Sequence, residues 1–282
     1  GIHLIQMLNM IEEFPIKDMG FGSADNLHIL AEVMKRAYAD RSKHLGDMDF
    51  YDVPFGLMSK EYSSFLNKSI SLNSRTASKD VFAGDPYPYE SPDTTHFSVM
   101  DQYGNAVSNT YTLNFSYGSG IMIPGTGMLM NNEMDDFSSK PGVPNGYGLL
   151  GSEANSIEAN KRPLSSMTPT IIFKDDKPYL VLGSPGGSRI ITTVLQVALN
   201  VMEHGMNVAQ AVNSPRIHHQ WLPETLMIEK GFGPDTEKLL QEKGYRLYPS
   251  STMGSVQAIL KDGEYFYGAA DPRRPGSGAV AP

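Results

Sequence analysis

Thr94 stands at the point where the chain changes character. Residues 84–92 read GDPYPYESP, and this proline-rich run can form neither a helix nor a central strand. Residues 95–100 then alternate with the two-residue period of a strand. A strand that starts abruptly at a threonine, directly after such a segment, suits a chain that is cut before Thr94. The cut would expose Thr94 as a new N-terminus.

An N-terminal threonine carries a nucleophile and a base on one residue. Its hydroxyl attacks, and its own α-amine, with a reference pKa near ~8, accepts the proton. The same hydroxyl could cut the precursor by attacking the carbonyl of Asp93, after which water would release the ester. On the Thr-Thr-His tripeptide alone, an ordinary threonine at the start of a strand remains the favoured interpretation.

The sequence after this strand predicts a hairpin. Residues 102–104 suit a three-residue loop with Gly104 in the left-handed conformation, and residues 105–113 alternate again as a return strand. Counting outward from the loop places Thr94 opposite Thr112, whereas a slip of one residue would place Leu113 there. The first register would bring a second hydroxyl beside the new N-terminus.

Three further clusters could do chemistry, although each has an ordinary structural explanation. Gly186 and Gly187 precede an amphipathic helix, where two backbone N–H groups could bind an oxyanion. The carboxylates at 133, 135 and 136 fit a metal, a glycosidase pair or a substrate ammonium group. Ser165 and Ser166, flanked by Arg162, could bind a carboxylate. The adjacent histidines at 218 and 219 would point to opposite faces of a strand, so we interpret them as structural.

The composition limits the class of protein. The 282 residues carry a net charge of −8, 40% of them are apolar, and cysteine is absent. We therefore expect a globular chain without a nucleic-acid partner, a disulfide, a thiolate nucleophile or a zinc–thiolate site. No run approaches the ~18 apolar residues of a membrane span, and no signal peptide is visible. Because the chain starts inside a helical pattern, we expect it to be a piece of a longer one.

The elements that must position these residues indicate an α+β fold. Helices are predicted over residues 2–14, 27–38 and 61–66, with Ser23 as the N-cap of the second and with Lys35, Arg36 and Asp40 on its outer side. Residues 68–93 suit a mobile linker. The remaining predictions are strands over 128–130, 170–173, 179–182, 256–260 and 265–269 and helices over 188–202, 206–213 and 236–243.

In combination, these segments resemble the γ-glutamyltranspeptidases, which are N-terminal-nucleophile hydrolases. The similarity extends over essentially all 282 residues. The matching stretches, in family order and spacing, are GIHLIQMLN, GFGSADNLHILAE, DTTHFSV, GNAVSNTYTLN, NNEMDDFSSKPGVPN, NKRPLSSMTPTI, GSPGGSRIITTVLQ and HHQWLP.

The resemblance implies a four-layer αββα sandwich, autocatalytic cleavage between Asp93 and Thr94, and a γ-glutamyl ester on Thr94. Residues 1–93 would be the C-terminal part of the large subunit and residues 94–282 the small catalytic subunit, and the two would associate. The implied roles are as follows: Thr112 beside the nucleophile; Gly186 and Gly187 as the oxyanion hole; Asn114, Glu133 and Asp136 on the substrate amino group; Ser165 and Ser166 on its carboxylate; and Tyr147 as the tip of a lid.

The resemblance also implies the reaction and its surroundings. The enzyme would transfer or hydrolyse γ-glutamyl groups from glutathione-like amides, with water, amino acids or peptides as acceptors and with neither cofactor nor metal. Bacterial relatives suggest a periplasmic or secreted location. The family's carboxylate-binding arginine lies in a part of the large subunit that residues 1–93 do not match. Two alternatives remain: a related amidase acting on poly-γ-glutamate or β-lactam side chains, and an unprocessed, inactive fragment.

Overall fold

The computed structural model describes residues 1–89, 101 and 103–280. Asp93, Thr94 and the predicted strand that follows them lie outside the described residues. Helices form the N-terminal part: α1 (Ile2–Ile11), α2 (Ile16–Met19), α3 (Ala24–His44) and α4 (Lys60–Asn67). The predicted N-cap is confirmed, because the Ser23 side chain accepts a hydrogen bond from the backbone N–H of Asn26.

The long helix α3 is buried along nearly its whole surface. It packs against α1, α7, β3 and α2. The prediction that Lys35, Arg36 and Asp40 lie on an outer side is wrong, since all three are at most 3% exposed. Lys35 and Arg36 pair with the buried Glu32 at 2.6 Å. Their charges are tolerated inside the protein because each is paired and hydrogen-bonded.

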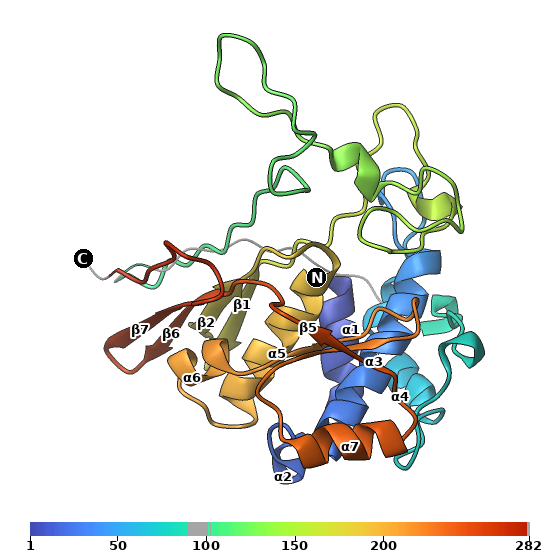
Figure 1. Cartoon of the computed structure of the whole chain (residues 1–282), viewed down its shortest axis with the longest axis vertical. Coiled ribbons are helices and arrows are strands. Elements are labelled where there is room, and N and C mark those ends of the chain that lie inside the picture. Colours follow the sequence, from blue (N-terminus) through green and yellow to red (C-terminus); the bar gives the residue numbers. More distant parts are fainter. Residues whose placement is uncertain (90–100, 102, 281–282) are drawn as a thin grey trace.

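A four-stranded antiparallel sheet has the strand order β1–β2–β6–β7. Its strands are β1 (Thr170–Lys174), β2 (Lys177–Gly183), β6 (Gln257–Asp262) and β7 (Tyr265–Ala270). Asp175 and Asp176 both have positive φ angles in the β1–β2 turn, and Gly263 does so in the β6–β7 turn. Helix α5 (Ile190–Met202) packs on β2, and α6 (Val208–Asn213) packs on β6 and β7 (Figure 1).

A smaller sheet contains β3 (Ile217–His218), β4 (Leu226–Glu229) and β5 (Leu247–Ser250), with α7 (Pro234–Glu242) between the last two. Short 3₁₀ helices complete the described structure: Phe55–Met58, Ser78–Asp80, Tyr87–Tyr89, Glu133–Asp136, Glu153–Asn155 and Gly187–Arg189. The mixed α and β content agrees with the sequence prediction. Within the described residues, no helix has both the length and the apolar character needed to cross a membrane.

The described residues between the N-terminal helices and β1 are largely irregular. The left-handed conformation predicted for Gly104 is confirmed, since its φ is 92°, and its N–H donates to the carbonyl of Asp101 at 3.1 Å. Residues 105–113 have no strand assignment, and their predicted partner strand lies outside the described residues. The predicted strand at 128–130 is reduced to one bridge, between Met122 and Leu129. The green segment that contains this bridge projects from the body of the molecule (Figure 1).

The linker predicted over residues 68–93 is in contact with the core where it is described. His28 bonds the carbonyl of Ser71, and the indole N–H of Trp221 donates to the carbonyls of Ser78 and Val81. The N–H of Gly84 donates to Asp40 at 2.8 Å. The mobility of this segment and the boundary at residue 93 stay predictions.

Candidate active site

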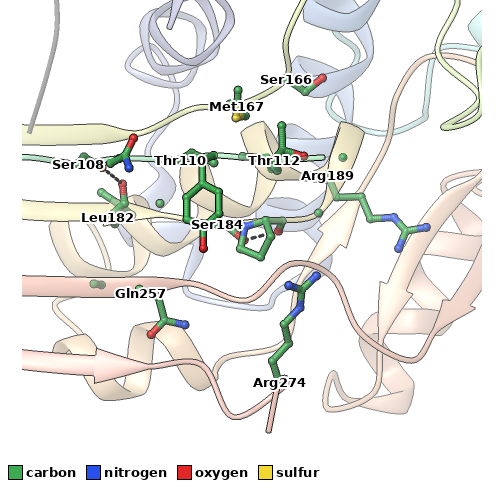
Figure 2. Close-up of a pocket in the computed structure, with 18 of the residues that line it drawn as sticks. Ser108, Thr110, Thr112, Ser166, Met167, Leu182, Ser184, Arg189, Gln257 and Arg274 are labelled. Carbon is green, nitrogen blue, oxygen red and sulfur yellow. Dashed lines mark hydrogen bonds between the residues drawn. The ribbon is translucent and has the colours of Figure 1, made fainter. Parts of the chain in front are cut away.

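A cavity of about 1070 Å³ lies between residues 107–116, the approach to β1, the β2–α5 loop and the C-terminal segment (Figure 2). It is lined by eight of the residues that the sequence selected: Thr112, Asn114, Asp136, Tyr147, Ser165, Ser166, Gly186 and Gly187. Glu133 is not in its wall but bonds Asp136 through its side chain. Asp93 and Thr94 lie outside the described residues, so the register of Thr94 against Thr112 stays a prediction.

The two glycines form a turn that other residues would not fit. Gly187 has a φ of 58°, in the left-handed region that favours glycine. A Cβ atom there would lie 2.2 Å from the Tyr147 ring. Gly186 is backed by Gly254, which is 3.3 Å from the position of a Cβ atom on Gly186. The turn leads through a short 3₁₀ segment into α5, so its N–H groups lie near the start of a thirteen-residue helix and suit an anion.

The acidic end of the cavity contains two coupled carboxyl groups. Burial, and then the charge of Glu133, raise the pKa of Asp136 to about 6. Burial also raises the pKa of Glu133, and its Oε1 is buried without a hydrogen-bond partner. An unpartnered buried carboxylate oxygen favours a donor such as an ammonium group. Asp135 has a different task, because it accepts the Gly146 N–H at 3.1 Å.

The asparagine at this end is held in a strained conformation. Asn114 has a φ of 71°, and its N–H donates to Thr112 Oγ1 at 2.7 Å. Its side chain donates to the carbonyl of Asn132 at 3.1 Å, which leaves the amide oxygen as an acceptor beside the carboxyl groups. Thr112 and Asn114 are thus fixed relative to each other at the wall of the cavity.

The hydroxyl end is supported by an arginine that sequence reasoning missed. Arg41 of α3 donates from Nη2 to Ser166 Oγ at 3.0 Å. Ser165 Oγ accepts the Met167 N–H at 3.0 Å. The flanking Arg162 is instead directed to Asp47, and its side chain is 67% exposed. The suggestion that Arg162 helps the serines to bind a carboxylate is therefore wrong.

Tyr147 connects the acidic end of the site to the glycine turn. Its hydroxyl donates to the carbonyl of Asn114 at 2.7 Å, and its ring packs edge-on against Phe115. The side chain of Gln220 donates to the Tyr147 carbonyl at 3.2 Å. The half-buried ring lies against Gly187, so it covers the glycine turn as a lid residue would.

Two more cations line the cavity, Arg189 and Arg274 (Figure 2). Neither arginine was predicted from the sequence to belong to this site. His218 and His219 are structural, as predicted: both are buried, and His218 bonds Thr192 and Gln220. Within the described ranges, no group of three His, Cys, Asp or Glu residues is placed to hold a metal ion.

Comparisons with known proteins identify relatives of this chain. A glutathione hydrolase proenzyme of Escherichia coli is 56% identical over 97% of this chain, which covers 47% of that relative. The chain thus spans about half the length of the curated relatives it matches. The structure of a Helicobacter pylori γ-glutamyltranspeptidase T380A mutant is 58% identical, with a TM-score of 0.61, over 64% of this chain and 100% of that one.

A cephalosporin acylase from Bacillus halodurans shares the fold, with a TM-score of 0.78 at 23% identity over 97% of this chain and 48% of that one. The family described as γ-glutamyltranspeptidase matches residues 1–281. This match extends over nearly the whole chain and includes every residue of the cavity wall. The chain therefore belongs to the γ-glutamyltranspeptidase family.

Proposed function

We propose that this chain transfers and hydrolyses γ-glutamyl groups from glutathione-like amides through an ester on Thr94. The observation that carries the proposal is the composition of a single cavity wall. The Asp136 carboxyl group, two serine hydroxyls and a glycine turn meet there, although they come from segments as far apart as residues 136 and 187. These groups complement the amino group, the carboxylate and the reacting carbonyl of a γ-glutamyl donor.

The headgroup of such a donor is a zwitterion, so it needs acidic contacts at one end and hydrogen-bond donors at the other. Glu133, Asp136 and Asn114 would accept from its ammonium group. The buried Oε1 of Glu133 would gain the partner that it lacks. Ser165 and Ser166 would donate to its carboxylate. Held at both ends, the donor would present its γ-carbonyl at a fixed place in the cavity.

The reaction would then take two balanced steps. The Thr94 hydroxyl attacks the γ-carbonyl, its proton passes to the α-amine, and the leaving amine departs with a proton. Gly186 and Gly187 would donate N–H groups to the oxyanion, and Thr112 would hydrogen-bond the nucleophile. Water or the amine of an amino acid or peptide then attacks the ester and regenerates the hydroxyl. None of the steps requires a cofactor or metal.

The same nucleophile would make the active form. Attack by Thr94 on the Asp93 carbonyl would separate residues 1–93 from residues 94–282, and the two parts would remain associated as large and small subunits. The layering that we propose for the folded enzyme is the four-layer αββα sandwich. We also propose a periplasmic or secreted location, which rests on bacterial relatives alone.

Turnover of two chromogenic anilides tests the proposal. The γ-glutamyl anilide should be cleaved at least roughly tenfold more efficiently than the glutaryl anilide, which lacks the ammonium group and forfeits charge-assisted hydrogen bonds. Thr94→Ala should abolish both cleavage of the chain and turnover. Thr126→Ala, a change at an exposed threonine, should alter neither.

Three results would contradict the proposal. Equal turnover of the two anilides would favour a different acyl donor, such as a β-lactam side chain or poly-γ-glutamate. Turnover by Thr94→Ala would exclude the threonine mechanism. An intact Asp93–Thr94 bond after long incubation, together with no turnover, would favour an unprocessed and inactive protein.

A further inference from the structure

Arg41 is a buried cation placed directly behind the candidate site. It lies in the last turns of α3 and is only 6% exposed. Its Nη2 donates to Ser166 Oγ at 3.0 Å, across 125 positions of sequence. A guanidinium group taken out of water is stable only where its charge and its N–H groups find partners. The partners of this one belong to the two ends of the cavity.

Arg41 acts on both ends without lining the large cavity. A second, very small cavity of about 10 Å³ is bordered by Arg41, Asp136 and Leu164, and Asp136 also belongs to the wall of the large cavity. Asp136 and Ser166 thus stand between Arg41 and the space where a substrate would lie. Any effect of Arg41 on a substrate would pass through these two side chains.

The hydrogen bond from Arg41 determines what Ser166 can do. A hydroxyl carries one hydrogen to donate and accepts through its lone pairs. Arg41 has no acceptor, so in this pair Ser166 Oγ must accept, and its own hydrogen is free for another group. A serine held in this way favours an acceptor such as a carboxylate and disfavours a group that only donates.

We infer that Arg41 is a positioning residue that makes Ser166 a dedicated hydrogen-bond donor and thereby selects donors that carry an α-carboxylate. The inference rests on the proposed function. It assigns to α3 a task in specificity, although the Arg41 side chain does not line the large cavity. Arg41 also provides positive charge beside Asp136, which lowers the cost of keeping that carboxyl group ionised.

Other titratable groups face Arg41 and Asp136. Asp136 is also under the influence of Glu133 and Asp135, and both of their carboxylates raise its pKa, whereas Arg41 lowers it. Arg41 faces Tyr38 on its own helix and His3 on α1. Burial keeps His3 and Tyr38 uncharged near neutral pH, because it lowers the pKa of His3 and raises that of Tyr38.

The test compares two anilides in Arg41→Gln, Arg41→Lys and the parent protein. One carries the γ-glutamyl group, and the other carries the 4-aminobutyryl group, which lacks only the α-carboxylate. The readout is the ratio of the two kcat/KM values, which does not depend on the fraction of protein that is folded or processed. Arg41→Gln should lower this ratio roughly tenfold, and Arg41→Lys should restore part of it.

Arg36→Lys is the matched control. Arg36 is another buried arginine of α3, but it bonds Glu32, Ser69 and Thr76 at a distance from the cavity. The control should leave the ratio unchanged even where it lowers stability. A second readout is the acidic limb of the kcat/KM profile. It should move to higher pH in Arg41→Gln, because Asp136 would lose its positive neighbour.

Each outcome supports or overturns the inference. An unchanged ratio in Arg41→Gln would overturn it. If neither Arg41 variant folds, Ser166→Ala is compared with Ser165→Ala, because Ser166 Oγ accepts from Arg41 whereas Ser165 Oγ accepts from the Met167 N–H. Ser166→Ala should lower the ratio more than Ser165→Ala, and an equal or smaller loss would overturn the inference. If the parent protein cleaves neither anilide, the proposed function fails. Calorimetry would then compare the affinity for L-glutamate with the affinity for 4-aminobutyrate, which tests Arg41 alone. If Arg41→Gln prefers L-glutamate as strongly as the parent protein does, the inference is overturned.

Discussion

Gly187→Ala is expected to cripple the glycine turn through a collision with a single aromatic ring. The new Cβ would lie 2.2 Å from Cε1, 2.5 Å from Cδ1 and 2.6 Å from Cζ of Tyr147. An ordinary carbon contact is ~3.5 Å, so the ring or the turn must retreat by roughly 1.3 Å. The Tyr147 hydroxyl is fixed by the carbonyl of Asn114, and its ring by Phe115, so the ring resists.

The expected loss has two parts. An alanine in the left-handed region costs about 1 kcal/mol of stability. A displaced oxyanion donor lowers kcat by about 100-fold or more. Gly205→Ala separates the two, because Gly205 has a φ of 63° with nothing within 4 Å of a new Cβ. This control should lose stability without loss of kcat.

Removing the ring should relieve the collision. In a double-mutant cycle, Gly187→Ala combined with Tyr147→Ala should retain about tenfold more kcat than the product of the two single effects predicts, an interaction energy of about 1.4 kcal/mol. The measurement is kcat for γ-glutamyl anilide, normalised to processed enzyme. Additive losses, or parental kcat in Gly187→Ala alone, would refute the steric reasoning.

Four further predictions follow from particular residues. KM for the γ-glutamyl donor should rise as pH falls below about 6, because burial and then Glu133 hold the pKa of Asp136 at that value and a protonated carboxyl group binds ammonium poorly; a KM that stays flat between pH 7 and 5 would contradict this assignment. Since the pKa of Asp136 is raised on folding, its contribution to stability is present at low pH and is lost as the pH rises from its ordinary value of 3.8 to about 6, so chemical denaturation should find Asp136→Asn more stable than the parent at pH 7. Arg162→Ala should leave KM and kcat within about twofold of the parent, because this exposed side chain is directed to Asp47 rather than to the serines; a large increase in KM would restore it to the site. Gly84→Ala should lower the free energy of unfolding by about 1–3 kcal/mol, since its Cβ would lie 2.2 Å from the buried Tyr62 hydroxyl; urea denaturation measures this loss, with Gly278→Ala as the control because a Cβ there meets open space without a left-handed φ, and equal losses in the two variants would exclude the collision.

The sequence predicted most of the regular elements because their signals are local. Ser23 caps the start of its helix by accepting from the N–H three residues later, and the dipeptide at 262–263 marks its hairpin. The wrong predictions concern partners that are distant in sequence. Asp40 and Arg36 looked exposed because amphipathic patterns assume that one face of a helix meets water. Here α3 is enclosed on several sides, and the buried Glu32 carboxylate neutralises the charges of Lys35 and Arg36.

In the candidate site, too, local patterns could be interpreted from the sequence, whereas partners distant in sequence could not. Residue types and spacing singled out Gly186, Gly187 and the carboxylates, but their roles came from family resemblance, because alone each had an ordinary alternative. Arg41 gave no signal, since its partner Ser166 is 125 positions away and nothing in the local pattern of α3 marks it. Residue type and spacing did not distinguish Asp135 and Arg162 from the other candidates for the site. Their contacts do, because Asp135 accepts the Gly146 N–H and Arg162 pairs with Asp47.

The most direct test of the central claim is the mass of the peptide that begins at residue 94, taken from enzyme quenched during turnover of a γ-glutamyl donor. We expect a free N-terminus at Thr94 and, on the Thr94 side chain, a mass increase equal to one γ-glutamyl group that disappears when water or an acceptor amine is allowed to react. A γ-glutamyl adduct on any other residue, or turnover by a chain whose Asp93–Thr94 bond is intact, would contradict it.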